Sequence, residues 1–204
     1  MNIPIVLYSS DYCPFSHRCR IVFCEKEMQP EIRSVDLHKK PEELVIYNPY
    51  NQVPVLVDRE VHIYESNIIN EYLDDRFPHP QLIPVDIILR ARARLMQHAL
   101  ENDIFRNVQI LEKRPNKERA EVCRKRIREG LLLLMARFTN NNRYIIDREF
   151  TMLDVSLAPL LWRLEHYKIS LPRKAAPLIK YAERVFSRPS FINSLSTIEK
   201  VMRK

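Results

Sequence analysis

Glycine is almost absent from this chain of 204 residues: Gly130 is the single glycine, against 14 prolines. Loops that wrap around phosphate groups need several glycines, because their backbone must approach the phosphate closely and adopt positive φ angles. The sequence therefore excludes Rossmann-type dinucleotide binding and the P-loop.

The charge of the chain is distributed unevenly. A chain of this length can form one large domain or two small ones. The net charge is +7, but residues 1–82 carry 8 Lys and Arg against 13 Asp and Glu, whereas the remainder carries 25 against 13. This change of sign indicates two units that meet near residue 82. The basic part is suited to nucleic acid, to an acidic protein surface or to the acidic part of a second copy. Direct DNA binding is the least favoured, because the basic residues are scattered and no helix-turn-helix or RNA-binding signature is present.

Neither a membrane segment nor a metal site is indicated. No stretch approaches the roughly 18 apolar residues of a membrane span, and the N-terminus lacks a signal-peptide pattern, so we expect a cytosolic protein with no membrane partner. Three of the four cysteines fall in one predicted helix at spacings that fit neither a disulfide framework nor a zinc site, and the histidines show no metal-ligand spacing. We expect free thiols and no bound metal. The cysteines are Cys13, Cys19, Cys24 and Cys123.

The first 76 residues alternate short apolar runs with helical patterns. A strand, a helix and a second strand predict a parallel pair, while a three-residue link between the last two strands predicts an antiparallel hairpin, so the sheet is mixed. Pro54 lies inside the third run, which indicates either an edge strand or a cis peptide after Val53. The predicted strands are 3–8, 31–36, 53–57 and 61–64, and the predicted helices are 14–28, 41–47 and 66–76.

Beyond this region the pattern is helical. Three prolines interrupt residues 77–84, which we interpret as an ordered linker. Thr151 and Asp154 have the spacing of a capping box at the start of an apolar helix. We expect domains at 1–76 and 87–204, joined by a proline-rich linker at 77–86. The predicted helices of the second domain are 87–111, 117–138, 152–167, 175–187 and 191–201.

The segment around Cys13 follows the first predicted strand. Pro14 suits the first position of a helix, where its missing N–H costs nothing. Cys13 then stands at the helix N-terminus, where free N–H groups and the helix dipole favour a thiolate. From these residues alone, a reactive thiolate and a small capping residue remain equal alternatives.

Three motifs in this order resemble the glutathione site of the glutathione transferase superfamily: Cys13-Pro-Phe-Ser16 after a strand, Gln52-Val-Pro54 before a strand, and Glu65-Ser66 at the start of a helix. The resemblance implies the glutathione-transferase fold, an α+β thioredoxin-like βαβαββα domain followed by an all-helical domain. It implies that Val53 offers backbone groups to the glutathione cysteinyl unit, that Glu65 and Ser66 hold the γ-glutamyl end, and that Lys39 or Lys40 approaches the glycyl carboxylate. The implied glutathione-binding residues are Cys13, Phe15, Lys39, Lys40, Gln52, Val53, Pro54, Glu65 and Ser66.

Within the superfamily, residues 71–84, 157–164 and 184–191 look like the stringent starvation protein A family. That resemblance implies a homodimeric transcription accessory protein that associates with RNA polymerase holoenzyme. It places Pro78, His79 and Pro80 on the polymerase-binding surface. Tyr72 and Asp75 are one helical turn apart, and we expect them to share this surface. From the residues alone, the prolines present the His79 imidazole on a stiff backbone, and a histidine that merely packs or caps at the linker is the alternative.

The role of Cys13 separates two hypotheses. Members of the stringent starvation protein A family are generally regarded as lacking ordinary transferase activity, which implies a protein that is not an enzyme. Cysteine-type transferases such as the omega class carry a cysteine at this position. The alternative is therefore a glutathione-dependent thiol transferase or reductase that uses Cys13.

Overall fold

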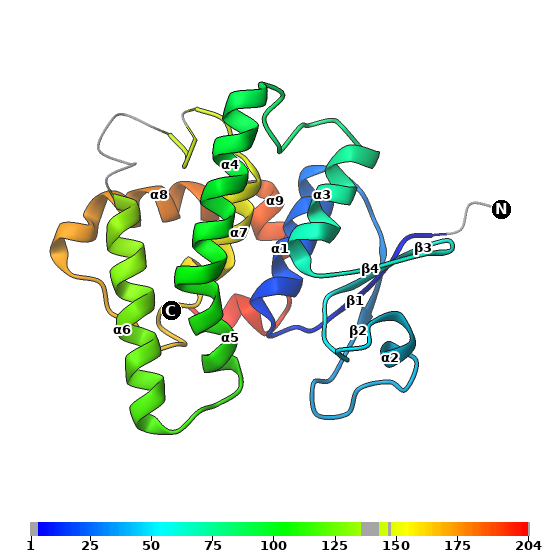
Figure 1. The fold of residues 1–204 in the computed structure, drawn as a ribbon, viewed down its shortest axis with the longest axis horizontal. Helices are drawn as coiled ribbons and strands as arrows, with labels where there is room; N and C mark the ends of the chain where they lie inside the picture. Colours follow the sequence, from blue (N-terminus) through cyan, green and yellow to red (C-terminus); the bar gives the residue numbers. More distant parts are fainter. Residues whose placement is uncertain (1–3, 136–142, 147, 204) are drawn as a thin grey trace. The chain divides into compact units, whose positions relative to one another are not determined.

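The computed structural model describes residues 4–135, 143–146 and 148–203. Contacts divide them into two compact units (Figure 1). The first unit contains the chain up to Gln81 together with Ser187–Met202, and the second contains Leu82–Phe186 with Arg203.

The first unit is built on a mixed sheet. Its strands are β1 (Val6–Ser9), β2 (Glu31–Ser34), β3 (Val55–Asp58) and β4 (Val61–Tyr64), and their order in the described part of the sheet is β2-β1-β3-β4. β1 runs parallel to β2 and antiparallel to β3, and β3 forms the predicted antiparallel hairpin with β4. β3 is an inner strand that begins just after Pro54, and the Val53–Pro54 bond is cis. The cis alternative is therefore correct and the edge-strand alternative is wrong.

Three helices complete the predicted βαβαββα order: α1 (Pro14–Glu25), α2 (Leu44–Tyr47) and α3 (Ser66–Arg76). In Figure 1, α1 and α3 lie together on one side of the sheet and α2 lies on the other. Successive side chains of β1 alternate between these faces. Val6 and Tyr8 join the cluster beneath α2 that also contains Leu44, while Leu7 is fully buried.

The C-terminal segment returns to the first unit. Helix α9 (Pro189–Ser194) packs on α1, and a 3₁₀ turn (Glu199–Val201) follows it. These two short elements stand where the sequence predicts one helix over 191–201. The sequence assigned residues 187–202 to the helical domain, whereas their contacts are with the sheet-containing unit.

The second unit is helical within the residues that the structure describes. Its helices are α4 (Ile87–Leu100), α5 (Arg106–Glu112), α6 (Lys117–Leu134), α7 (Met152–Trp162) and α8 (Ala176–Phe186). A π-helical turn (Glu101–Phe105) joins α4 to α5 without a break, so the predicted helix 87–111 is present and contains a π turn. The last residues of the predicted helix 117–138 lie outside the described residues. α7 ends at Trp162, before the predicted end at 167.

The predicted capping box starts α7. The backbone N–H of Thr151 donates to Asp154 Oδ2 at 2.8 Å. Asp154 is completely buried, and its carboxylate also accepts from the Ile145 N–H and the Tyr181 hydroxyl. Burial raises the pKa of Asp154, while these donors act in the opposite direction. One carboxylate therefore fixes the start of the most apolar helix of the unit.

Candidate functional site

Cys13 stands at the N-terminus of α1, as the sequence predicts. Its backbone is extended, and Pro14 occupies the first helical turn. The Cys13 thiol donates to the Val53 carbonyl oxygen with Sγ and O 3.9 Å apart. The structure thus brings the thiol beside the segment that precedes β3. Cys13 is 7% exposed, so only a small part of its surface is open to solvent.

Polar side chains shape the segment beside the thiol. Asn48 Nδ2 donates to the Gln52 carbonyl oxygen at 2.8 Å, and Lys40 Nζ donates to the Asn51 carbonyl oxygen at 2.7 Å. Asn51 has a φ of 51°, a left-handed conformation that asparagine tolerates better than most residues. Lys40 is therefore tied to the residues next to Val53, whereas the Lys39 side chain is exposed.

The N-terminus of α3 forms another part of the site. Ser66 begins the helix, and exposed Glu65 precedes it with a φ of 69°. Arg18 Nη1 donates to Ser66 Oγ and to Asn67 Oδ1, each at 3.2 Å. Its guanidinium carbon also lies 5.0 Å from the centre of the Phe15 ring. Since Arg18 is only 1% exposed, a buried positive charge lies beside the free amides of the helix.

The sequence does not mark Arg18 as a site residue, because an arginine in a helix normally points to solvent. The available signal was its place among Cys19, Ile21 and Val22, all of them fully buried in α1. His17 and Arg20 of α1 are also buried. They were not predicted as site residues either, because polar and charged side chains of a helix are mostly exposed.

Arg20 ties the loop before Cys13 to the C-terminal segment. Its Nη1 donates to Ser9 Oγ at 2.6 Å and to the Ser10 carbonyl oxygen at 3.2 Å. Its Nη2 lies 2.6 Å from both carboxylate oxygens of Glu199, and its Nε donates to the Ser194 carbonyl oxygen at 3.0 Å. The loop that carries the thiol is thereby fixed by a contact with residues near the other end of the chain.

Other candidate nucleophiles are held in neutral forms. The Tyr8 hydroxyl donates to Glu43 Oε1 at 2.7 Å and accepts from Arg33 Nη1 at 2.8 Å. Burial, aided by Glu43, raises the pKa of Tyr8 to about 12. Burial also raises the pKa of the Cys19 and Cys24 thiols. Each of the cysteines, all in the described part of the chain, is a free thiol. Cys13 is the candidate for thiol chemistry because it lies at the N-terminus of α1.

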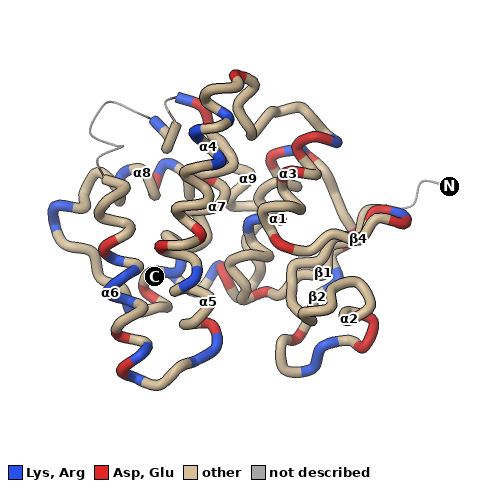
Figure 2. The backbone as a smooth tube through the Cα atoms, viewed as in Figure 1, with Lys and Arg blue, Asp and Glu red and all other residues tan. Residues whose placement is uncertain are grey.

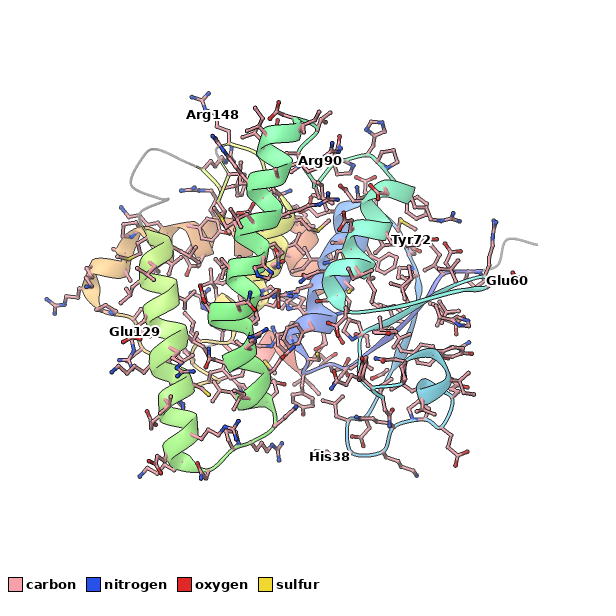
Figure 3. The ribbon with its side chains drawn as sticks, in the orientation of Figure 1. His38, Glu60, Tyr72, Arg90, Glu129 and Arg148 are labelled. Carbon is pink, nitrogen blue, oxygen red and sulfur yellow. The ribbon has the colours of Figure 1, made fainter. Side chains whose placement is uncertain are left out.

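The second predicted surface lies at the C-terminal end of α3. Pro78, His79 and Pro80 are exposed, and the His79–Pro80 bond is cis, a feature that the sequence did not reveal. The Tyr72 hydroxyl donates to Asp58 Oδ2 at 2.8 Å, and Arg76 Nε contacts the same oxygen at 2.8 Å. Burial raises the pKa of Tyr72, which keeps its hydroxyl a donor. Figure 3 shows Tyr72 on α3.

The described ranges contain neither a candidate metal site nor a helix that could span a membrane. No cluster of three or more His, Cys, Asp or Glu side chains could hold a metal ion. No helix there combines the length and apolar composition that crossing a membrane requires.

Comparisons with known proteins agree with the fold. The model of the glutathione S-transferase N-terminal domain matches residues 12–76, and that of the C-terminal domain matches residues 95–189. A stringent starvation protein A homolog of Coxiella burnetii is 39% identical over 201 residues, which are 98% of this chain and 95% of the relative. Glutathione S-transferase omega-2 of Rattus norvegicus is 43% identical over 93 residues, 45% of this chain and 38% of that protein.

A solved structure extends the likeness to three dimensions. The rice glutathione S-transferase GST1, crystallised in complex with glutathione, superposes with a TM-score of 0.83 at 27% identity, over 99% of this chain and 94% of that one. Both domain models match, and the similarity to the Coxiella burnetii protein spans nearly the full chain. The chain therefore belongs to the stringent starvation protein A family of the glutathione S-transferase superfamily.

Proposed function

We propose that this protein is a cytoplasmic, homodimeric transcription accessory factor that binds RNA polymerase holoenzyme. The binding surface consists of Tyr72, Asp75, Pro78, His79 and Pro80, and is called the His79 surface below. The observation that carries the proposal is the exposed imidazole of His79 between two exposed prolines. A surface that is already rigid loses little conformational entropy when a partner binds. The family of the chain, defined over nearly its full length, supports this partner.

Affinity chromatography tests the proposal. The wild-type protein is immobilised and exposed to native bacterial cytosol, with His79→Ala, Cys13→Ala and His38→Ala columns in parallel. His38 is a matched control because it is an exposed histidine of the same unit. We expect the wild-type, Cys13→Ala and His38→Ala columns to retain polymerase and the His79→Ala column to lose it. Absence of polymerase from every column contradicts the proposal.

We further propose that the region around Cys13 binds glutathione. Two features support this role: the Cys13 thiol next to the Val53 carbonyl, and Ser66 at the start of α3 with Arg18 beside it. The free amides of a helix N-terminus and a buried cation suit a carboxylate. Lys40 rather than Lys39 is suited to the glycyl carboxylate, because it already lies beside Asn51.

An enzymatic role is the second candidate, and the position of Cys13 favours it. A thiolate at a helix N-terminus can attack a glutathione mixed disulfide, releasing the second thiol as the leaving group and forming a mixed disulfide with Cys13. Omega-2 similarity over part of the chain supports this chemistry. This candidate requires turnover that Cys13→Ala abolishes while glutathione binding persists.

The pH dependence of alkylation tests the state of the thiol. We expect iodoacetamide to label Cys13 with a midpoint below about 8.5, the value of a free thiol. Cys24 and Cys19 react with higher midpoints, because burial raises their pKa values. Mass spectrometry of peptides from partly labelled protein separates the three sites. A Cys13 midpoint at or above that of Cys24 contradicts the enzymatic role.

A further inference from the structure

Lys26 is a buried lysine whose surroundings explain the position of the His79 loop. It follows the last residue of α1, and its side chain is completely buried. A buried ammonium group is costly unless acceptors surround it. Lys26 Nζ lies 2.5 Å from Asp74 Oδ1 and 2.5 Å from the Pro80 carbonyl oxygen. One cation therefore joins α1, α3 and the loop.

The two acceptors differ in what they fix. Asp74 belongs to α3, and its side chain is 3% exposed, so this ion pair joins two helices inside the unit. The Pro80 carbonyl belongs to the loop, whose residues 78–80 are exposed. The carbonyl points inward to Lys26 while the residue itself remains at the surface, so this contact fixes the loop at Pro80, beyond the end of α3 at Arg76.

The end of α3 has a separate support. Asp58 holds Tyr72 and Arg76, and the Arg76 guanidinium carbon lies 5.4 Å from the centre of the Phe77 ring. These contacts reach the loop only as far as Phe77. The Lys26 contact holds the loop further along the chain, because it fixes Pro80, the residue directly after His79.

We propose that Lys26 is a positioning residue for the His79 surface: its ammonium group, anchored by Asp74, holds the Pro80 carbonyl and so presents the His79 imidazole to a protein partner. The inference rests on the proposed function of that surface. A hydrogen bond from a charged donor is about twice as strong as a neutral one. Loss of the hydrogen bond from Lys26 to the Pro80 carbonyl lets the loop adopt several conformations, of which one fits the partner. We therefore expect polymerase binding to be about tenfold weaker.

The test must separate loop position from folding. Lys26→Met alone leaves the Asp74 carboxylate buried without its cation and can fail to fold. Lys26→Met/Asp74→Leu removes both charges, and replacing a buried ion pair by apolar residues is often neutral for stability. The matched control is Lys125→Met/Glu129→Leu, which removes an exposed pair on α6 with the same change in charge.

Two measurements are made on full-length protein. The first is the NMR order parameter of the His79 and Gln81 backbone amides. We expect about 0.85 in the wild type and in the control, and below about 0.6 in Lys26→Met/Asp74→Leu. The second is the affinity for purified RNA polymerase holoenzyme, with tenfold weaker binding expected for that variant and none of this loss for the control.

Each result decides a separate point. Order parameters that stay near the wild-type value show that Lys26 does not position the loop and overturn the inference. A loosened loop with unchanged polymerase affinity also overturns it. If the wild type itself does not bind polymerase, the proposed function fails and the inference about partner presentation falls with it. The order parameters then still report whether Lys26 holds the loop.

Discussion

The Arg20–Glu199 pair joins residues 179 positions apart in the chain. The Glu199 side chain is completely buried and that of Arg20 is 7% exposed. Glu199→Leu leaves the guanidinium buried without its carboxylate, which typically costs 3–5 kcal/mol. We expect the free energy of unfolding to fall by about 3 kcal/mol, measured by urea denaturation.

An exposed ion pair provides the control for this substitution. Glu183 pairs with Arg203, and the Glu183 side chain is 52% exposed. Glu183→Leu should lower the free energy of unfolding by less than about 1 kcal/mol. Equal effects of the two substitutions mean that the Arg20–Glu199 pair contributes no more than a surface contact.

Replacing Asn70 should raise the free energy of unfolding rather than lower it. Asn70 lies in α3 with no exposed surface, and neither its Oδ1 nor its Nδ2 has a hydrogen-bond partner among the described residues. A buried polar group without a partner costs about 1–3 kcal/mol. Asn70→Leu, which is close to isosteric, should therefore raise the free energy of unfolding by about 1 kcal/mol.

Asn67 provides the control for Asn70→Leu. Asn67 lies on the same helix, but its Oδ1 accepts a hydrogen bond from Arg18. Asn67→Leu should be destabilising in the same urea assay. A loss of stability in Asn70→Leu contradicts the prediction.

At the level of elements, Gly130 explains how α6 approaches the π-helical turn. A Cβ atom at Gly130 would lie 2.6 Å from Cγ1 and 3.0 Å from Cδ1 of Ile104. Gly130→Ala gains up to about 1 kcal/mol in helix propensity, but overpacking costs about 1–3 kcal/mol. We expect a net loss of about 1 kcal/mol in the free energy of unfolding.

A double-mutant cycle isolates the clash. Ile104→Ala removes the atoms that the new methyl group would meet, so Gly130→Ala should be neutral or stabilising in that background. If Gly130→Ala destabilises both backgrounds equally, the loss does not come from contact with Ile104.

Local patterns predicted much of the fold. The order of elements up to Arg76 and the capping box of α7 follow from signals within a few residues, whereas Pro54 left a cis bond and an edge strand as alternatives. The candidate thiol and the exposed His79 were likewise visible in short motifs. The residues that hold the thiol loop and the His79 surface in place could not be predicted. Arg20 and Lys26 resemble ordinary surface charges in the sequence, because their partners Glu199 and Asp74 are far away in the chain. The same limit applies to α9, whose packing on α1 leaves no local signal.

For the molecule as a whole, the proposed homodimer needs a surface that the folded chain leaves uncovered. Along and just before α4 the apolar side chains of Val85, Ile87, Ile88 and Leu95 are exposed. Basic residues recur along α6 and in the loop before it (Figure 2). An apolar stripe supplies affinity through burial, while opposite charges on the two parts of the chain guide association.

These features lead to a prediction about self-association. Sedimentation should show a dimer at low ionic strength that weakens as salt is added, because exposed charges are screened beyond about 10 Å at 0.1 M salt. Leu95→Glu places a charge within the apolar stripe and should yield a monomer with unchanged secondary structure. Leu133→Glu is the control, since Leu133 on α6 is 80% exposed and Leu95 is 71% exposed. A wild-type monomer at low salt contradicts the homodimer, and dissociation by Leu133→Glu alone moves the interface from α4 to α6.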